Sequence, residues 1–246
     1  METGLRLDNL PLVFDRLAPD ASRTDAASPS VPTLFLHGLH SVRAGEKSEA
    51  LFADHAARGL GALRVDLRGH GETGGSIGST PLSRHVEDVA CLLRAHGKAR
   101  LFGSSFGGLI AAWTAAKHPD LVEGLTLLAP AFGFLPRLAA HRQPDGCATY
   151  PHDVGAVRFE AEVLDDFGSH HESELPSTID CPTLVVHGAD DDVVPLAEVQ
   201  TFDERRPTDR RSALWILHRG DHRLADPIGS ILALSAEFHR LPDRSH

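Results

Sequence analysis

The stretch that decides the fold is Arg100-Leu-Phe-Gly-Ser-Ser-Phe-Gly-Gly-Leu-Ile-Ala-Ala-Trp113. An apolar run enters a Gly/Ser segment and an alanine-rich run leaves it, as expected where a strand turns directly into a helix. The segment has the spacing G-x-S-x-G centred on Ser105. Such a turn strains its central residue and presses the positions two before and two after against neighbouring backbone, where only glycine fits. The pattern therefore predicts that Ser105 projects its hydroxyl from a strand-to-helix turn.

The position of Ser105 also suits chemistry on an acyl group. The free N–H groups and the dipole at a helix N-terminus favour negative charge, and an acyl-transfer oxyanion is such a charge. Ser105 is therefore the candidate nucleophile, and Ser104 is its neighbour at the strand end. A Gly/Ser turn without activity is the alternative for this motif taken alone.

A serine nucleophile needs a histidine base that is oriented by a carboxylate. Two later loops supply these groups: HGADDDVVP begins at His187 after an apolar strand, and HRGDHRLADP begins at His218 after the next one. Catalytic groups of parallel sheets gather at the carboxyl ends of the strands, where both loops fall. His222 is the expected base, and the acidic triplet 190–192 is the expected source of the carboxylate. A solvated acidic turn or a weak cation site is the alternative for the triplet.

The rest of the chain alternates short apolar runs with amphipathic stretches. Strands are expected at 33–37, 62–67, 100–103, 124–128, 182–187 and 213–217, and helices at 46–58, 82–95, 106–118, 196–205 and 227–240. Residues 12–17 are expected to pair at one edge of the sheet, followed by a loose connection over 20–30. This alternation predicts an α/β fold with a mostly parallel central sheet and helices on both faces.

One segment, residues 131–178, interrupts this alternation. It shows no clear strand, and it carries eight acidic residues against three arginines together with several phenylalanines and leucines. A long irregular insertion in a compact domain is usually a functional lid or a disordered loop, and the aromatic content favours a lid. We therefore expect a core of residues 1–130 and 179–246 with a small inserted lid at 131–178. Its apolar side chains either line an acyl pocket or dock the lid on the core.

Taken together, these motifs resemble those of the α/β-hydrolase family. The family pattern G-x-x-D-x-x-V-P matches Gly188, Asp191, Val194 and Pro195. The match selects Asp191 from the acidic triplet as the carboxylate that orients the base, with Asp190 as the fallback.

The resemblance also implies an oxyanion hole. His37-Gly-Leu39 follows a strand, as the family's oxyanion-hole loop does, and the backbone N–H groups of Leu39 and Phe106 would hold the oxyanion. The stretch from Asp66 to Thr73 resembles the family's D-x-R-G-H-G-x-S segment, which is structural, so His70 is not the expected base.

The family resemblance implies a serine esterase that acts on a small-molecule ester, for which we expect no cofactor or metal. Because the segment 131–178 is modest in length and contains no long apolar helix, we expect a short-to-medium acyl chain, and an aryl acyl chain is compatible. A thioesterase with the same three residues is the nearest alternative, and an inactive hydrolase fold that serves as a binding module is a further one. A metalloenzyme would rest on His170-His-Glu172 or on His37 and His40, which lack the H-E-x-x-H spacing. A nucleotide cofactor is disfavoured because GSSFGG is neither a Rossmann nor a Walker pattern.

Composition and charge disfavour some classes of partner and indicate a cellular location. The 246 residues carry a formal net charge of −10, which argues against nucleic acid or an anionic membrane as a partner. The N-terminus lacks the pattern of a secretory signal, and no apolar run approaches the roughly 20 residues of a membrane span. Three widely spaced cysteines are typical of free thiols, which predicts a cytoplasmic location. The sequence leaves the oligomeric state open.

Overall fold

A seven-stranded sheet organises the computed structural model, which describes residues 6–7, 10–20, 22, 31–152 and 154–240. Its strands are β3 (Phe14–Leu17), β4 (Thr33–Leu36), β5 (Ala62–Val65), β6 (Ala99–Ser104), β7 (Val122–Leu128), β10 (Thr183–Gly188) and β11 (Ser212–Leu217). The spatial order is β11-β10-β7-β6-β4-β5-β3. Six strands run parallel and β3 pairs antiparallel with β5 at one edge. The carboxyl ends of the parallel strands therefore share one edge of the sheet.

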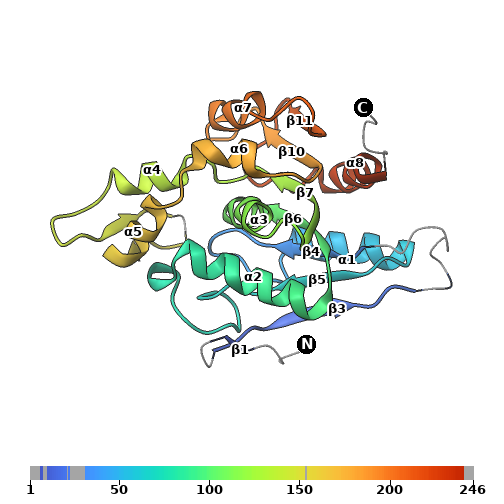
Figure 1. Ribbon diagram of the computed structural model, residues 1–246, viewed down its shortest axis with the longest axis horizontal. Coiled ribbons are helices and arrows are strands. Elements are labelled where there is room, and N and C mark those ends of the chain that lie inside the picture. The colour runs from blue at the N-terminus through green and yellow to red at the C-terminus, as the bar shows by residue number, and fades with distance from the viewer. Residues whose placement is uncertain (1–5, 8–9, 21, 23–30, 153, 241–246) are drawn as a thin grey trace.

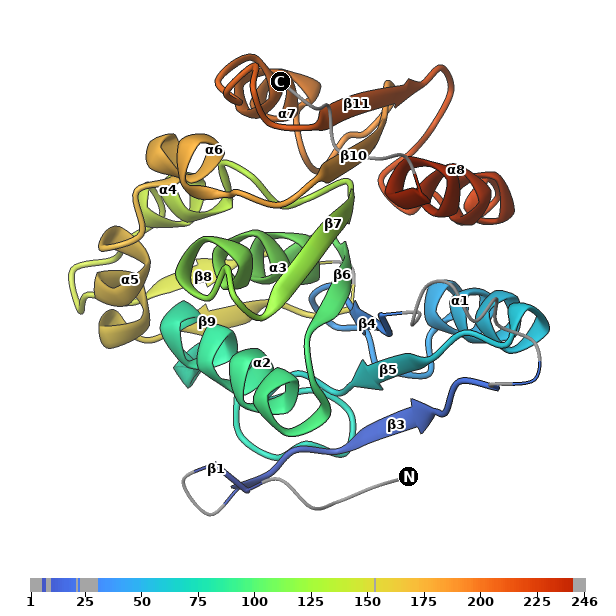
Figure 2. The ribbon, with the colours of Figure 1, turned by 45° about the vertical axis from the view of Figure 1, so that its right-hand side comes forward.

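Helices cover both faces of this sheet. They are α1 (Glu46–Arg58), α2 (Leu82–His96), α3 (Phe106–Lys117), α7 (Leu196–Glu204) and α8 (Ile228–Arg240). Figures 1 and 2 show α2 and α3 on one face and α1 and α8 on the other. Alternate side chains of each central strand enter different cores: Leu101 lies in the core under α2 and α3, and Phe102 lies in the core under α1 and α8. This explains why the strands are almost continuously apolar.

The predicted core elements are confirmed, with boundaries within two residues of the expected ones. The predicted edge strand over 12–17 is also confirmed, since β3 pairs with β5. The sequence patterns missed the short hairpin of β1 (Arg6–Leu7) and β2 (Leu10–Pro11) and the 3₁₀ turn η1 (Ile77–Ser79). The loose connection predicted over 20–30 lies almost entirely outside the described residues. Among the helices that the structure describes, none is long and apolar enough to cross a bilayer.

The segment 131–178 is more ordered than its sequence suggested. It contains α4 (Phe134–Ala139), β8 (Ala148–Tyr150), β9 (Val157–Phe159), α5 (Ala161–Gly168), η2 (Glu172–Glu174) and α6 (Leu175–Thr178). The expectation of no strand was wrong, because β8 and β9 form a small antiparallel ladder of three residues each. Three residues are too few to show a period, so the pattern gave no signal. These elements lie beside α2 and α3 in Figures 1 and 2.

Buried aromatic side chains fasten this segment to the core. The Phe134 ring lies edge-to-face with the rings of Phe106, Tyr150, Phe159 and Phe167, at centroid distances of 5.9, 5.1, 6.1 and 6.3 Å. All four phenylalanines belong to the same apolar core as α2 and α3. Of the two roles expected for the apolar side chains of 131–178, the contacts of these rings fit docking on the core. The role of the segment as a lid stays a prediction.

Candidate active site

Ser105 occupies the turn between β6 and α3. Its backbone has φ 52° and ψ −117°, a strained conformation for a residue with a side chain. A Cβ on Gly103 would lie 2.5 Å from the carbonyl oxygen of Gly107, and one on Gly107 would lie 2.2 Å from the carbonyl oxygen of Leu36. The turn therefore requires glycine at both positions, as the sequence pattern predicts.

The structure brings together the three side chains that the sequence selected for a triad. Oγ of Ser105 lies 2.9 Å from Nε2 of His222, and Nδ1 of His222 lies 2.8 Å from Oδ2 of Asp191. A carboxylate only accepts, so Nδ1 carries the proton and Nε2 is free to accept one from the serine hydroxyl. These contacts match the arrangement that a serine nucleophile, a histidine base and an orienting carboxylate require, and the catalytic roles of the three residues stay a prediction.

Asp191 lies at the carboxyl end of β10 with its side chain fully buried. Its Oδ1 accepts the backbone N–H groups of Val193 and Val194 at 2.9 and 2.8 Å, which leaves Oδ2 for His222. Burial works to raise the pKa of Asp191, but the hydrogen bonds from His222 and the loop amides outweigh it and hold that pKa below its usual value. Asp190, the fallback, is exposed, so the loop directs only Asp191 to the histidine.

The two expected oxyanion donors belong to two neighbouring segments, the loop after β4 for Leu39 and the turn that begins α3 for Phe106. Gly38 packs directly on Ser105, since a Cβ there would lie 3.3 Å from the Ser105 Cβ. Phe106 is the first residue of α3, and among the described residues neither its N–H nor that of Leu39 has a hydrogen-bond acceptor. Both amides are therefore available to a ligand beside Ser105. Their role in holding an oxyanion stays a prediction.

His37 fixes the peptide that carries the Leu39 N–H. The backbone N–H of Leu67 donates to His37 Nε2 at 3.1 Å, so the imidazole proton is on Nδ1, which donates to the Gly38 carbonyl at 2.8 Å. Burial, with a further contribution from nearby His70, lowers the pKa of His37 to about 4 and keeps the ring neutral. The Gly38 carbonyl and the Leu39 N–H belong to one planar peptide, so holding the carbonyl also aims the N–H.

The two adjacent serines have different partners. Whereas Ser105 faces His222, Oγ of the buried Ser104 lies 3.1 Å from Nζ of Lys47, at the start of α1. Burial and the charge of Arg223 lower the pKa of Lys47. Ser104 therefore links α1 to the turn, and the sequence patterns gave no hint of Lys47.

The histidines considered as metal ligands have separate partners. The ring of His170 lies against Trp113 at 4.8 Å, while Glu172 accepts the backbone N–H of Gly133 at 2.6 Å. His40 packs on the ring of His152 at 4.5 Å, whereas the ring nitrogens of His37 are bonded to the backbone of Gly38 and Leu67. Over the described residues, no group of three or more potential ligands is arranged to hold a metal ion.

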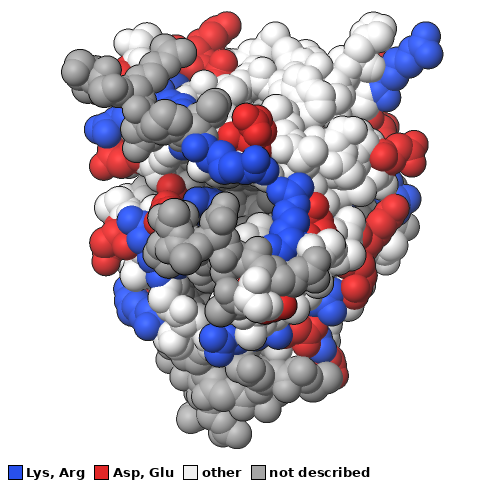
Figure 3. Space-filling model, turned by 90° about the vertical axis from the view of Figure 1, so that its right-hand side faces the viewer, with Lys and Arg blue, Asp and Glu red and all other residues white. Residues whose placement is uncertain are grey.

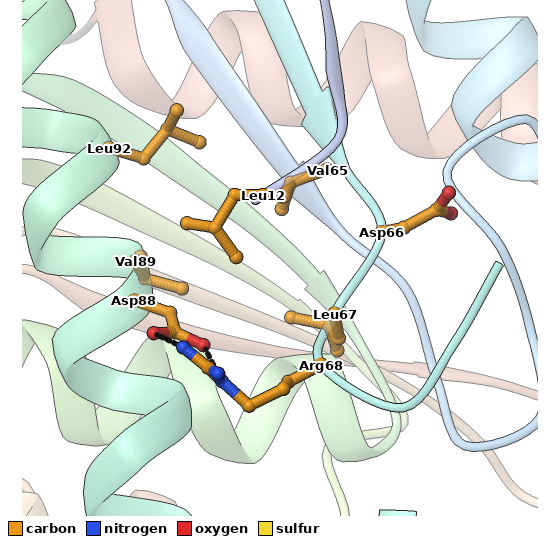
Figure 4. A pocket seen from close by; sticks show the side chains of 8 residues that line it. All are labelled: Leu12, Val65, Asp66, Leu67, Arg68, Asp88, Val89 and Leu92. Atoms are coloured by element: carbon orange, nitrogen blue, oxygen red, sulfur yellow. Dashed lines mark hydrogen bonds and ion pairs between the residues drawn. The ribbon is translucent and has the colours of Figure 1, made fainter. Parts of the chain in front are cut away.

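Two hollows elsewhere in the molecule are less suited to catalysis. The small cavity in Figure 4, beside the Arg68–Asp88 ion pair, has a volume of about 10 Å³, room for one water at most. An open cleft of about 510 Å³ lies at the amino ends of the strands, and its Arg100 and Asp180 are paired with Glu123 and Arg210. Ligands of parallel α/β sheets bind at the carboxyl ends of the strands, opposite to this cleft, where Ser105 lies.

On the side of the molecule that carries α1 and α8, basic and acidic side chains are interspersed (Figure 3).

Known proteins are similar to this chain in sequence and in fold. Residues 27–150 match the family described as serine aminopeptidase, S33. A pimeloyl-[acyl-carrier protein] methyl ester esterase of Chromobacterium violaceum is 32% identical over 79% of this chain and 69% of its own. The bovine mitochondrial palmitoyl-protein thioesterase ABHD10 is 26% identical over 83% of this chain and 70% of its own.

Among solved structures, α/β-hydrolase domain-containing protein 10 from mouse has the same fold. It superimposes with a TM-score of 0.81 over 96% of both chains, at 23% identity. At this identity the likeness supports the fold alone.

Proposed function

Because the chain belongs to the α/β-hydrolase family, we propose that it is a serine hydrolase that cleaves carboxylic esters. The observation that carries the proposal is the continuous path from Ser105 Oγ through the His222 ring to Asp191, with hydrogen-bond distances of 2.9 and 2.8 Å. An inactive binding module would have no need to keep three side chains from three separate loops in this alignment.

In the proposed reaction, Ser105 attacks the ester carbonyl while His222 Nε2 takes its proton. The carbonyl oxygen becomes an oxyanion that accepts the N–H groups of Leu39 and Phe106, a type of interaction worth about 3–4 kcal/mol of barrier per donor. Asp191 holds the His222 ring in the Nδ1–H tautomer and stabilises the imidazolium.

Collapse of the intermediate breaks the bond to the alcohol. His222 returns its proton to the leaving oxygen, and the acyl group stays on Ser105 as an ester. Water then attacks this acyl-enzyme with His222 again as base, which releases the acid and restores Ser105. No step needs a cofactor.

For the substrate we propose a small-molecule ester with a short-to-medium or aryl acyl chain. Three phenylalanines of 131–178 (Phe134, Phe159 and Phe167) are buried against one another, and Phe134 also packs on Phe106, so these rings leave no long apolar channel between them. We further propose that this segment acts as a lid over Ser105. The free thiols Cys91, Cys147 and Cys181 support a reducing compartment such as the cytoplasm.

A thioesterase is the second candidate, and the similarity to a palmitoyl-protein thioesterase over 83% of the chain is the observation that favours it. The same three residues serve both reactions, because only the leaving atom differs. Substrate preference must therefore be measured directly.

The test is a series of initial hydrolysis rates on p-nitrophenyl esters from acetate to palmitate, with wild type beside Ser105→Ala. Matched thioesters of the same acyl chains, followed by thiol release, run in parallel. We expect turnover by wild type and a loss of at least about 10⁴-fold in the variant. The chain-length optimum then measures the acyl site.

Full activity in Ser105→Ala would overturn the proposal. Faster thioester than ester cleavage at every chain length would replace the first candidate with the second. If a fluorophosphonate probe fails to label wild type and no substrate turns over, the binding module becomes the better account.

A further inference from the structure

His187 is a buried histidine that the proposed reaction does not use. It lies near the end of β10, and its side chain is completely shielded from solvent. Its Nε2 is 3.0 Å from the carbonyl oxygen of Val194 and 3.5 Å from Oδ2 of Asp191. A carbonyl oxygen only accepts, so the ring proton is on Nε2. Nδ1 has no hydrogen-bond partner among the described residues, which makes the Nε2–H tautomer the one that this site can hold.

The carbonyl that His187 holds belongs to the residue that holds Asp191. The N–H groups of Val193 and Val194 both donate to Asp191 Oδ1, while the Val194 carbonyl accepts from His187 Nε2. His187 therefore holds the loop that carries Asp191 through a hydrogen bond to its backbone, on the buried side of that loop. Nε2 of His187 and Nδ1 of His222 both lie near Asp191 Oδ2, at 3.5 and 2.8 Å.

The charge state of His187 fits this arrangement. The ionisable groups that face its ring are Asp191, from its own loop, and His222, from the loop after β11. Burial lowers the pKa of His187 despite the opposing effect of the Asp191 carboxylate, so the ring is neutral at neutral pH. A neutral N–H offsets part of the charge of Asp191 and leaves the carboxylate ionised, whereas an imidazolium would compete with His222 for the same oxygen.

We propose that His187 is a positioning residue that acts through Asp191: its Nε2–H fixes the Val194 carbonyl and, with it, the orientation in which Asp191 Oδ2 faces His222. This inference rests on the proposed function, since it assigns a role within the same site. It places a second imidazole beside the carboxylate that orients the proposed base.

Two variants separate the hydrogen bond from the volume of the ring. His187→Gln keeps an N–H donor at a distance from the backbone similar to that of Nε2, and His187→Leu fills a similar volume without a donor. With p-nitrophenyl acetate, we expect His187→Leu to lower kcat by about 10–100-fold with KM within about threefold, by analogy with the loss of an outer partner of a catalytic ligand. His187→Gln should recover most of kcat.

The pH dependence of kcat/KM provides a readout that a merely structural role would not move. Without the His187 N–H, the full charge of Asp191 acts on His222, so the imidazolium is more stable and the proton leaves at higher pH. The acidic limb of the profile should therefore move to higher pH in His187→Leu and stay in place in His187→Gln. Thermal unfolding of both variants is measured beside these profiles.

Two results would overturn the inference. One is a folded His187→Leu variant with the kcat and acidic limb of wild type. The other is a loss of activity that follows thermal stability in both variants, without recovery by glutamine.

A measurement without turnover separates this inference from the proposed function. The proton between His222 Nδ1 and Asp191 gives a low-field NMR signal in a rigid site, whether or not an ester is cleaved. We expect His187→Leu to shift or broaden that signal and His187→Gln to keep it. An inactive wild type with this response contradicts the esterase proposal alone, and an unchanged signal in His187→Leu contradicts the role of His187.

Discussion

The loops at the carboxyl edge of the sheet and the segment 131–178 border the same serine but are held in different ways. In the loops, the contacts are directional hydrogen bonds between particular atoms: Oδ1 of Asp191 accepts two backbone amides, and Oδ2 faces His222. In the segment, the Phe134 ring contacts four other aromatic rings, and none of these contacts is directional enough to be indispensable.

This difference has a consequence for mutation. A directional hydrogen bond is lost with the one atom that makes it, so the loops should lose function through isosteric substitutions that barely change volume. A packed cluster responds to volume, so the segment should tolerate apolar exchanges and fail on truncation. Substitutions that change one property at a time therefore test whether the two regions differ as the contacts indicate.

The largest effect is expected at Asp191. Asp191→Asn keeps the size of the side chain but offers His222 an amide in place of a carboxylate, which favours the wrong tautomer. We expect kcat for p-nitrophenyl acetate to fall by about 10⁴-fold with little change in the thermal midpoint. The control is Asp190→Asn, one residue earlier on the same loop and exposed. Equal losses in both variants would mean that the loop responds to net charge and not to the bond with His222.

The next effect is expected at Phe134, in stability. Phe134→Ala removes a ring that is 4% exposed and should lower the free energy of unfolding by about 3–5 kcal/mol, measured with urea. Phe134→Leu keeps more of the volume and should cost clearly less. The ester rate per folded molecule should change far less than in Asp191→Asn. If Phe134→Leu instead abolishes turnover while folded, the ring lines the acyl site and the contrast between the two regions fails.

The sequence was informative where one residue type is forced by backbone geometry. Gly103 and Gly107 could be recognised because a Cβ at either would clash with backbone, and G-x-x-D-x-x-V-P chose Asp191 over Asp190 because that loop presents only one carboxylate inward. The apolar strands and amphipathic helices of the core could likewise be predicted, because their hydrophobic patterns are long enough to be recognised.

The sequence was uninformative where a role depends on partners distant in the chain. Lys47 lies in an ordinary helix start, and only folding brings it to Ser104. His187 is close to Asp191 in the chain, but it lies in an ordinary strand end, and the pattern does not show that its ring turns toward the carboxylate. In 131–178 the elements are short, with strands of three residues, so no period emerges from the pattern. Aromatic content indicated that the segment packs but could not show against which residues.

A smaller effect, on the pH dependence of the free energy of unfolding, is expected at His85. His85 packs on the Phe106 ring at 5.4 Å, and burial lowers its pKa to about 3 from an ordinary 6.5. The unfolded chain therefore binds a proton at this residue below about pH 6.5, whereas the folded chain does not until about pH 3. The free energy of unfolding should fall as pH is lowered through this window.

His85→Leu should flatten this dependence. Neither ring nitrogen of His85 has a hydrogen-bond partner among the described residues, so the substitution removes no bond of that kind. Urea midpoints at pH 7 and pH 4.5 should differ less in His85→Leu than in wild type, with the exposed His141→Leu as control. The same difference in both variants would show that other groups dominate acid unfolding.

The smallest effect is expected at Ser104, the last residue of β6 and the direct neighbour of Ser105. Ser104→Ala removes the partner of Lys47 Nζ, and leaving that half-buried group unpaired should cost about 1 kcal/mol of stability. The rate on p-nitrophenyl acetate should stay within about tenfold of wild type, because Ser105 and His222 keep their contact. Ser104→Ala combined with Lys47→Met removes both partners and should recover part of the lost stability. A drop in rate as large as that of Ser105→Ala would mean that the two neighbouring serines share the chemistry, and that the contact with His222 does not by itself distinguish the nucleophile.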